Sequence, residues 1–234
     1  MTVQRVFNMK SPILKKILYR AKKVFGRDPD RFFKSVSGVI HVGANTGQER
    51  EYYRKLGLRV LWIEPIPRVF EELKLNLVEY PKQQAIQALV TDKDNETYDF
   101  HVANNNGASS SILEIKECRD IWPSIDFEGT IPLNSTTLTS LLLDQNIDIS
   151  LYDCLVMDTQ GTELLVLKGG ESILKHFQYI KTEVANFESY TGCCRFEEIE
   201  EFMGIHGFRE LHRHAFAWRC KGGAYYDVVY MRNV

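Results

Sequence analysis

The chain has 234 residues, 44% of them hydrophobic, so it is long enough to bury one substantial core, and a single α/β domain is the expected size class. The formal net charge of −2 argues against a nucleic-acid binder, because such proteins present a strongly basic surface. Five cysteines at irregular spacing predict neither a disulfide framework nor a zinc motif, and they indicate a reducing compartment.

The N-terminal segment differs from the rest of the chain in charge. Residues 1–27 contain eight lysines and arginines and no acid, and apolar residues recur at helical spacing from Ile13 to Phe25. We therefore predict a basic amphipathic helix within residues 1–36, followed by the main domain over residues 37–234. The helix either packs against the domain or makes peripheral contact with an anionic membrane through residues 1–27. No apolar run approaches the ~20 residues of a membrane span, so we expect a cytoplasmic protein.

From Gly38 onward, short apolar runs alternate with helix-like stretches. The pattern predicts strands over residues 38–43, 58–65, 84–90, 152–158 and 179–187, with an added edge strand over 96–104. Helices are expected over 46–57, 67–80, 138–145, 161–177 and 195–207, the fourth broken at Gly169 and Gly170. Residues 114–137 are interrupted by prolines and predict a loop with a short strand over 130–134. Residues 208–216 and 224–232 close the chain as a hairpin through CKGG.

Strands that alternate with helices predict a Rossmann-like α/β fold. Its sheet should be mostly parallel, connected right-handedly and covered by helices on both faces, with the C-terminal hairpin as an antiparallel addition. Ligands of such sheets bind beyond the carboxyl ends of the strands, where the strand order reverses.

The stretch HVGANTG, residues 41–47, lies between a predicted strand and a predicted helix. Gly43 permits backbone angles that a side chain would block, and Gly47 leaves room for a flat group at the first helical turn. Unpaired N–H groups at a helix start suit a carboxylate or a phosphate. Glu64 ends the next strand about 20 residues later, where an acid accepts hydrogen bonds from both ribose hydroxyls. The two features together predict a nucleoside cofactor.

The interval GANTG lacks the middle glycine of the GxGxxG pattern, which lets the backbone meet a pyrophosphate. A ligand with a nucleoside but no pyrophosphate is therefore favoured, which indicates S-adenosyl-L-methionine rather than a nicotinamide dinucleotide. A tight turn that binds nothing would need its glycines just as much, and this alternative stays open.

Histidines near the C-terminus form the only pattern that suggests a metal. His212 and His214 alternate along a predicted strand, and His206 lies nearby in the sequence. The same spacing is typical of a solvated strand face, so we expect no metal site.

Six segments in chain order resemble the FkbM-family methyltransferases, a branch of the class I S-adenosylmethionine-dependent enzymes. They are VIHVGANTGQE, LWIEPIP, ALVTDKDNETYDFHVANNNGASSSI, TTLTSLLLD, LVMDTQGTELLVLKG and IKTEV. The resemblance runs from about Val39 to Val184. It implies the seven-stranded class I methyltransferase sheet and methyl transfer, typically to an oxygen acceptor.

The resemblance also assigns roles to single residues. Gly43, Asn45 and Gly47 correspond to the cofactor loop, Glu64 to the ribose ligand, and Asp158 to an acid that faces the methyl-transfer site. The sequence departs from the family at two further positions. His41 takes the place of an aspartate in the cofactor site, and Gln160 takes the place of the glutamate in the family's D-x-E-G pattern.

An alcohol acceptor must lose its proton at some stage of methylation, so a general base is expected. Asp158, Glu183 and His101 are the candidates, in that order. A carboxylate close to the sulfonium would stabilise the ground state rather than the transition state, so Asp158 is expected to orient the cofactor or the acceptor.

Three functional hypotheses follow. The first is an O-methyltransferase that acts on a hydroxyl of a small molecule or glycan. The second is a non-catalytic module with the same fold, attached to a membrane or partner through its N-terminal helix and motivated by the two departures. The third, a nicotinamide oxidoreductase, is disfavoured by the missing glycine. Acceptor specificity is expected in residues 114–137 and 187–195. The oligomeric state is not predicted.

Overall fold

The structure is a computed structural model, and it describes residues 29–233. The predicted N-terminal amphipathic helix lies outside the described residues. Ser35–Val234 form one compact unit. Residues 29–34 belong to a separate unit and include most of a short 3-10 helix, η2 (Arg31–Ser35). Within residues 29–233, no helix is long and apolar enough to span a bilayer.

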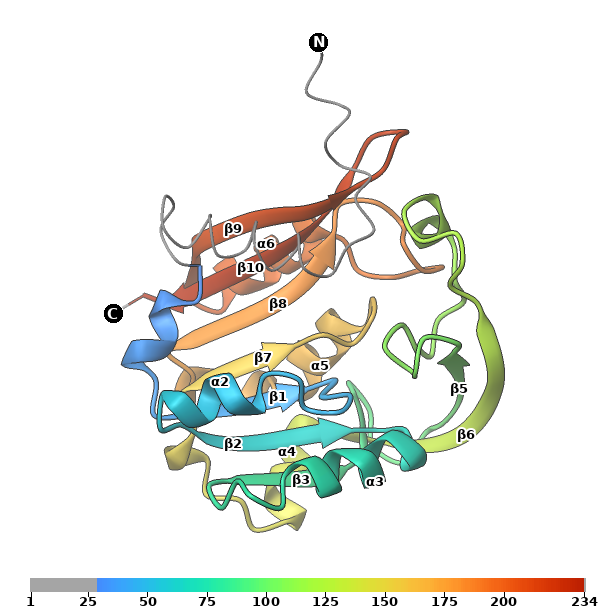
Figure 1. The fold of residues 1–234 in the computed structure, drawn as a ribbon. Helices are drawn as coiled ribbons and strands as arrows, with labels where there is room; N and C mark the ends of the chain where they lie inside the picture. Colours follow the sequence, from blue (N-terminus) through green and yellow to red (C-terminus); the bar gives the residue numbers. More distant parts are fainter. Residues whose placement is uncertain (1–28, 234) are drawn as a thin grey trace. The chain divides into compact units, whose positions relative to one another are not determined.

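A seven-stranded sheet forms the centre of the larger unit, in the order β3-β2-β1-β7-β8-β10-β9 (Figure 1). All its neighbouring pairs are parallel except β8 with β10 and β10 with β9, which are antiparallel. The strands are β1 (Gly38–Val42), β2 (Arg59–Glu64), β3 (Gln83–Gln87), β7 (Cys154–Met157), β8 (Tyr179–Ala185), β9 (Phe208–Trp218) and β10 (Ala224–Arg232). The predicted mostly parallel sheet with a C-terminal hairpin is therefore confirmed.

Helices cover both faces of this sheet, α2 and α3 on one face and α4, α5 and α6 on the other (Figure 1). Their bounds are α2 (Arg50–Lys55), α3 (Pro67–Asn76), α4 (Leu138–Asp144), α5 (Glu163–Gly169) and α6 (Phe196–Ile205), and short 3-10 helices occur at η3 (Glu117–Asp120), η4 (Ile149–Leu151) and η5 (Glu171–His176). Pro67 starts α3, and the Thr137 side chain caps α4 by accepting from the Ser140 N–H at 3.1 Å.

The largest cluster of buried apolar side chains lies between the sheet and α4, α5 and α6. Ile40, Leu61, Leu155, Ile180 and Val228 contribute one side chain from each of five neighbouring strands, and each is 0% exposed. Complete burial of such a side chain stabilises the fold by about 2 kcal/mol. This core fixes the positions of the strand ends that carry the polar residues described below.

A second sheet of three strands, β4-β6-β5, lies beyond the carboxyl ends of the main strands. Its strands are β4 (Leu89–Thr91), β5 (Thr97–Ala103) and β6 (Phe127–Thr137). The strand predicted over 84–90 is therefore two strands in two sheets, and the strand predicted over 96–104 does not extend the main sheet.

The short strand predicted over residues 130–134 lies within β6, which is longer than expected and takes up most of the second half of the predicted loop over 114–137. Pro132 has no N–H to donate, yet it does not interrupt the strand. β4 pairs with β6 only at Ser135, Thr136 and Thr137, so one edge of β6 is open beside Pro132. The missing N–H therefore breaks no ladder bond.

Candidate functional site

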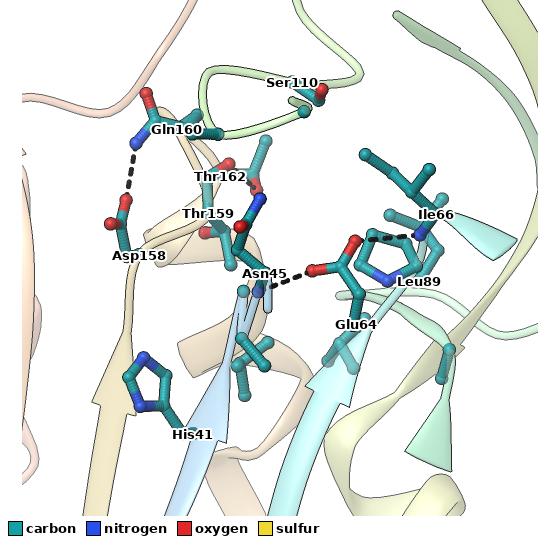
Figure 2. A pocket seen from close by; sticks show the side chains of 18 of the residues that line it. His41, Asn45, Glu64, Ile66, Leu89, Ser110, Asp158, Thr159, Gln160 and Thr162 are labelled. Atoms are coloured by element: carbon teal, nitrogen blue, oxygen red, sulfur yellow. Dashed lines mark hydrogen bonds between the residues drawn. The ribbon is translucent and has the colours of Figure 1, made fainter. Parts of the chain in front are cut away.

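A cavity of about 230 Å³ opens at the carboxyl ends of β1, β2 and β7 (Figure 2). β1 pairs with β2 on one side and with β7 on the other, so the cavity lies where the strand order reverses. Its wall combines polar residues with an apolar side, and it includes His41, Gly43, Asn45, Glu64, Asp158, Gln160, Ile66, Leu89, Phe100 and Ile112.

The turn after β1 is held between the two neighbouring strands. Gly43 has φ +81°, and a Cβ there would overlap the main-chain oxygen of Asp158. The N–H groups of Gly43 and Ala44 both donate to the Ile63 carbonyl at 3.0 Å. Asn45 follows with φ +44°, a left-handed conformation that asparagine tolerates better than most residues. The turn thus requires glycine for its own geometry.

Gly47 does not line the cavity. Its φ is +70°, and a Cβ at this position would lie 2.8 Å from Cδ1 of Leu73 on α3. Glycine is therefore favoured at position 47 by packing against Leu73, and not, as expected, by the need to leave room for a flat ligand. The helix also begins later than predicted, at Arg50.

Glu64 closes β2 with its carboxylate directed toward the cavity (Figure 2). One carboxylate oxygen accepts from the Asn45 N–H at 2.8 Å and the other from the Ile66 N–H at 2.9 Å. The side chain is 4% exposed, and this burial raises its pKa to about 7 although both hydrogen bonds act in the opposite direction. Each oxygen keeps a free lone pair, so the carboxylate can accept two further hydrogen bonds from a ligand.

His41 lies at the base of the cavity, stacked on Trp62 with ring centroids 4.9 Å apart. Burial lowers its pKa to about 3, and the positive charge of Lys181 acts in the same direction. The imidazole is therefore neutral at physiological pH. Its Nδ1 lies 3.4 Å from the Tyr53 hydroxyl. This neutral ring stands where the family pattern that the sequence resembles has an aspartate.

Asp158 follows β7 on the opposite wall from Glu64 (Figure 2). Its Oδ1 accepts from Nε2 of Gln160 at 2.5 Å. Burial raises its pKa, and the negative charge of Glu163 adds to the shift. A carboxyl that holds its proton more strongly than usual at a cavity wall is suited to accept and return a proton.

Glu183 lies beside Asp158 but not in the cavity. Met157 pairs with Thr182 in the sheet, so the two acids are the next residues on adjacent parallel strands. Glu183 lines a separate hollow of about 10 Å³, together with Gln160 and Tyr225. Burial and the charge of Asp158 raise its pKa well above the ordinary value.

The remaining sequence candidates lie elsewhere. His101 is not part of the cavity wall: its Nδ1 contacts Oγ1 of Thr130 at 3.1 Å and its Nε2 lies 3.3 Å from Glu114. His206 contacts the Phe202 carbonyl and Glu171. No group of three or more metal-ligating side chains occurs in the part of the chain that the structure describes.

The segment NNNGASSSI, residues 104–112, and Tyr190 complete the site. Gly107, Ala108 and Ser110 from this loop line the cavity, and Nδ2 of Asn45 donates to the Asn106 carbonyl at 3.1 Å. Tyr190 donates to Oε1 of Gln160 at 2.9 Å. The resemblance of NNNGASSSI to the family pointed to the loop. Tyr190 lies within residues 187–195, where acceptor specificity is expected, but no motif singled out this residue.

The strand order, the antiparallel last hairpin and a cavity at the switch point define a class I methyltransferase fold. A model of the methyltransferase FkbM domain matches residues 41–210. The chain therefore belongs to the FkbM methyltransferase family, as the resemblance of its segments predicted.

One relative and two solved structures illustrate the similarity. The relative, 2-O-methyltransferase NoeI of Sinorhizobium fredii (strain NBRC 101917 / NGR234), is 25% identical over 162 residues, which are 66% of this chain and 65% of that protein. The chain thus spans just under two thirds of the length of this relative. The METTL16 MTase domain superposes with TM-score 0.51 at 10% identity, over 95% of this chain and 69% of that chain. An uncharacterized protein from Listeria monocytogenes serotype 4b does so with TM-score 0.51 at 8% identity, over 96% and 69%. These two likenesses concern the fold alone.

Proposed function

We propose that this protein is an S-adenosyl-L-methionine-dependent O-methyltransferase that acts on a hydroxyl of a small molecule or glycan. The observation that carries the proposal is the buried carboxylate of Glu64, which faces the cavity beside the turn after β1. Family membership and a relative named as a 2-O-methyltransferase support it.

The residues of the cavity fit this cofactor. Glu64 can accept hydrogen bonds from two vicinal ribose hydroxyls, one at each oxygen. Ile66, Leu89 and Phe100 provide an apolar wall that suits a flat base. When bound, S-adenosyl-L-methionine supplies an activated methyl group.

The chain itself contributes alignment, exclusion of water and a proton acceptor. Methyl transfer is an in-line displacement, so most of the rate enhancement comes from holding the acceptor oxygen in position. Asp158 is the candidate base because it lines the cavity and holds a proton more strongly than an ordinary aspartate. Glu183 stands next to it but does not line the cavity, and the charge of Asp158 helps to hold the proton on Glu183.

Asp158→Asn tests this assignment. The asparagine keeps the size of the side chain but cannot accept a proton, so we expect turnover to fall about 10²-fold while the dissociation constant for S-adenosyl-L-methionine changes less than about threefold. Labelled cofactor with a panel of sugar and small-molecule alcohols measures turnover, and titration calorimetry measures binding. Unchanged turnover would remove Asp158 from the chemistry.

Calorimetry on the unmodified protein also separates the two hypotheses that remain. An enzyme must bind S-adenosyl-L-methionine or its demethylated product. A protein that gives no heat with either compound would instead be a non-catalytic module with a methyltransferase fold.

A further inference from the structure

Gln160 connects the end of β7 to two other segments that surround the cavity. Its Nε2 donates to Asp158, and its Oε1 accepts from the Tyr190 hydroxyl at 2.9 Å. Its main-chain carbonyl accepts from Oγ of Ser111 at 2.9 Å. Gln160 adopts φ +56°, which a glutamine rarely does, so these contacts hold it in a conformation that is unfavourable by itself.

The Tyr190 hydroxyl has two acceptors within hydrogen-bond distance but only one proton to donate. It lies 2.9 Å from Oε1 of Gln160 and 3.1 Å from the Ser109 carbonyl, and both are acceptors. A tyrosine hydroxyl has one proton and can donate to only one of them. Tyr190 is 1% exposed and packs in a buried cluster with Phe187 and Cys193.

Rotation of the Gln160 amide by half a turn resolves this imbalance. The rotation exchanges the oxygen and the nitrogen of the amide at nearly the same positions. The amide nitrogen then donates to the Tyr190 oxygen, and the Tyr190 proton is free to bond to the Ser109 carbonyl. The amide oxygen now faces Asp158, and this contact is favourable only when Asp158 carries a proton.

We propose that Gln160 and Tyr190 are positioning residues that form a reversible relay with Asp158. When Asp158 gains or loses its proton, the Asp158–Gln160 and Gln160–Tyr190 hydrogen bonds both change direction, and the Tyr190 hydroxyl turns toward or away from the Ser109 carbonyl. With Asp158 ionised, Gln160 donates to Asp158 and accepts from Tyr190. With Asp158 protonated, Asp158 donates to Gln160, Gln160 donates to Tyr190, and Tyr190 donates to Ser109. The carboxyl group stays hydrogen-bonded in both states.

The charges around Asp158 favour the protonated state. Acids face it from α5, β8, β10 and the turn before α2, namely Glu163, Glu183, Asp227 and Glu49. Lys181 on β8 is cationic and acts on Glu183 and His41, and His41 itself is neutral. A glutamate at position 160 would add one more negative charge and could not donate to an ionised Asp158. Gln160 avoids both effects, because an amide is uncharged and carries a donor as well as an acceptor.

The role of the relay in catalysis rests on the proposed function. As the acceptor oxygen bonds to the methyl carbon, the carbon–sulfur bond breaks and its electron pair stays on the sulfur. The O–H bond of the acceptor breaks as well, its electron pair stays on the acceptor oxygen, and the proton moves to a carboxylate oxygen of Asp158. The reversal of the relay keeps the new carboxylic acid hydrogen-bonded. Asp158 can then return the proton to solvent without a large change in structure.

Nuclear magnetic resonance on the protein without cofactor tests the relay. The protein is labelled with 13C at the aspartate carboxyls and with 15N at the glutamine amides, and Asp158→Asn and Gln160→Met assign the two residues. We expect the Gln160 amide resonances to titrate with the same midpoint as the Asp158 carboxyl. A Gln160 amide that does not respond at that midpoint would overturn the proposal.

The midpoint of Asp158 in two variants gives a second readout. In Gln160→Met both protonation states lose one hydrogen bond, so the relay predicts a shift of less than about half a pH unit. A fixed donor would stabilise only the ionised form, and its removal would raise the midpoint by about one unit or more, which would contradict the relay. Gln160→Glu should raise it by at least about one unit, a tenfold change in proton affinity. These measurements use no S-adenosyl-L-methionine, so failure of the proposed function would leave them intact.

Discussion

Replacement of Glu64 by alanine is expected to weaken binding of S-adenosyl-L-methionine about 10³-fold, as measured by titration calorimetry. The proposed ribose ligand is this buried carboxylate, which lines the cavity, and each hydrogen bond to a charged acceptor stabilises by about 1.5–3 kcal/mol. The variant also leaves the Asn45 and Ile66 N–H groups without their acceptor, which loosens the turn after β1.

Glu71→Ala is the matched control for this variant. Glu71 lies on α3 and its partner in the structure is Lys74, at 2.8 Å on the exposed side of the helix. We expect its removal to leave the dissociation constant unchanged. A loss smaller than about tenfold in Glu64→Ala would show that the nucleoside does not depend on this carboxylate.

The pH dependence of binding identifies the same group. Burial raises the pKa of Glu64 to about 7 in the free protein, and hydroxyl donors bind its ionised form. The ionised fraction falls below the pKa, so affinity should fall about tenfold for each pH unit below 7 and level off above it. Binding below pH 7 should release a proton. Glu64→Gln, which cannot titrate, should bind weakly without this dependence.

The sequence predicted the main sheet because its strands obey local rules. Residues 38–42, 59–64 and 154–157 are short, largely apolar runs whose side chains are almost all buried, and each is followed by a helix. The hairpin was equally clear, because β9 and β10 flank a glycine-containing turn. These elements carry their folding signal within a few residues.

The small sheet and the relay escaped prediction because they depend on distant partners. β6 alternates between exposed and half-buried side chains around Pro132, and this part of the chain becomes a strand through its pairing with β5. Gln160 was recognised as a departure from the family pattern and interpreted as a loss. Its contacts with Tyr190 and Ser111 join residues 30 and 49 positions away, and no local pattern encodes them.

The difference between local and long-range constraints also decides what a substitution in the turn after β1 should do. Sequence reasoning assigned Gly43 a conformational reason, and the structure adds a steric one. Its φ of +81° is strained for alanine, and the added Cβ would overlap the Asp158 main-chain oxygen. Because Val42 and Met157 pair in the sheet, the turn cannot move without separating β1 from β7. We expect Gly43→Ala to lower the free energy of unfolding by about 4 kcal/mol or more, measured by urea denaturation.

Gly57→Ala separates the steric part of this effect from the conformational part. Gly57 has φ +75°, close to that of Gly43, but a Cβ there meets no atom within 4 Å. Its replacement should therefore cost only the backbone strain, about 1–2 kcal/mol. If the two variants lose the same stability, the close approach of β1 to Asp158 is not a constraint. If Gly43→Ala loses far more stability than Gly57→Ala, the turn after β1 and the main chain of Asp158 pack as one rigid unit. We then expect Gly43→Ala to lose cofactor binding as well, because the added Cβ disrupts the contact between them.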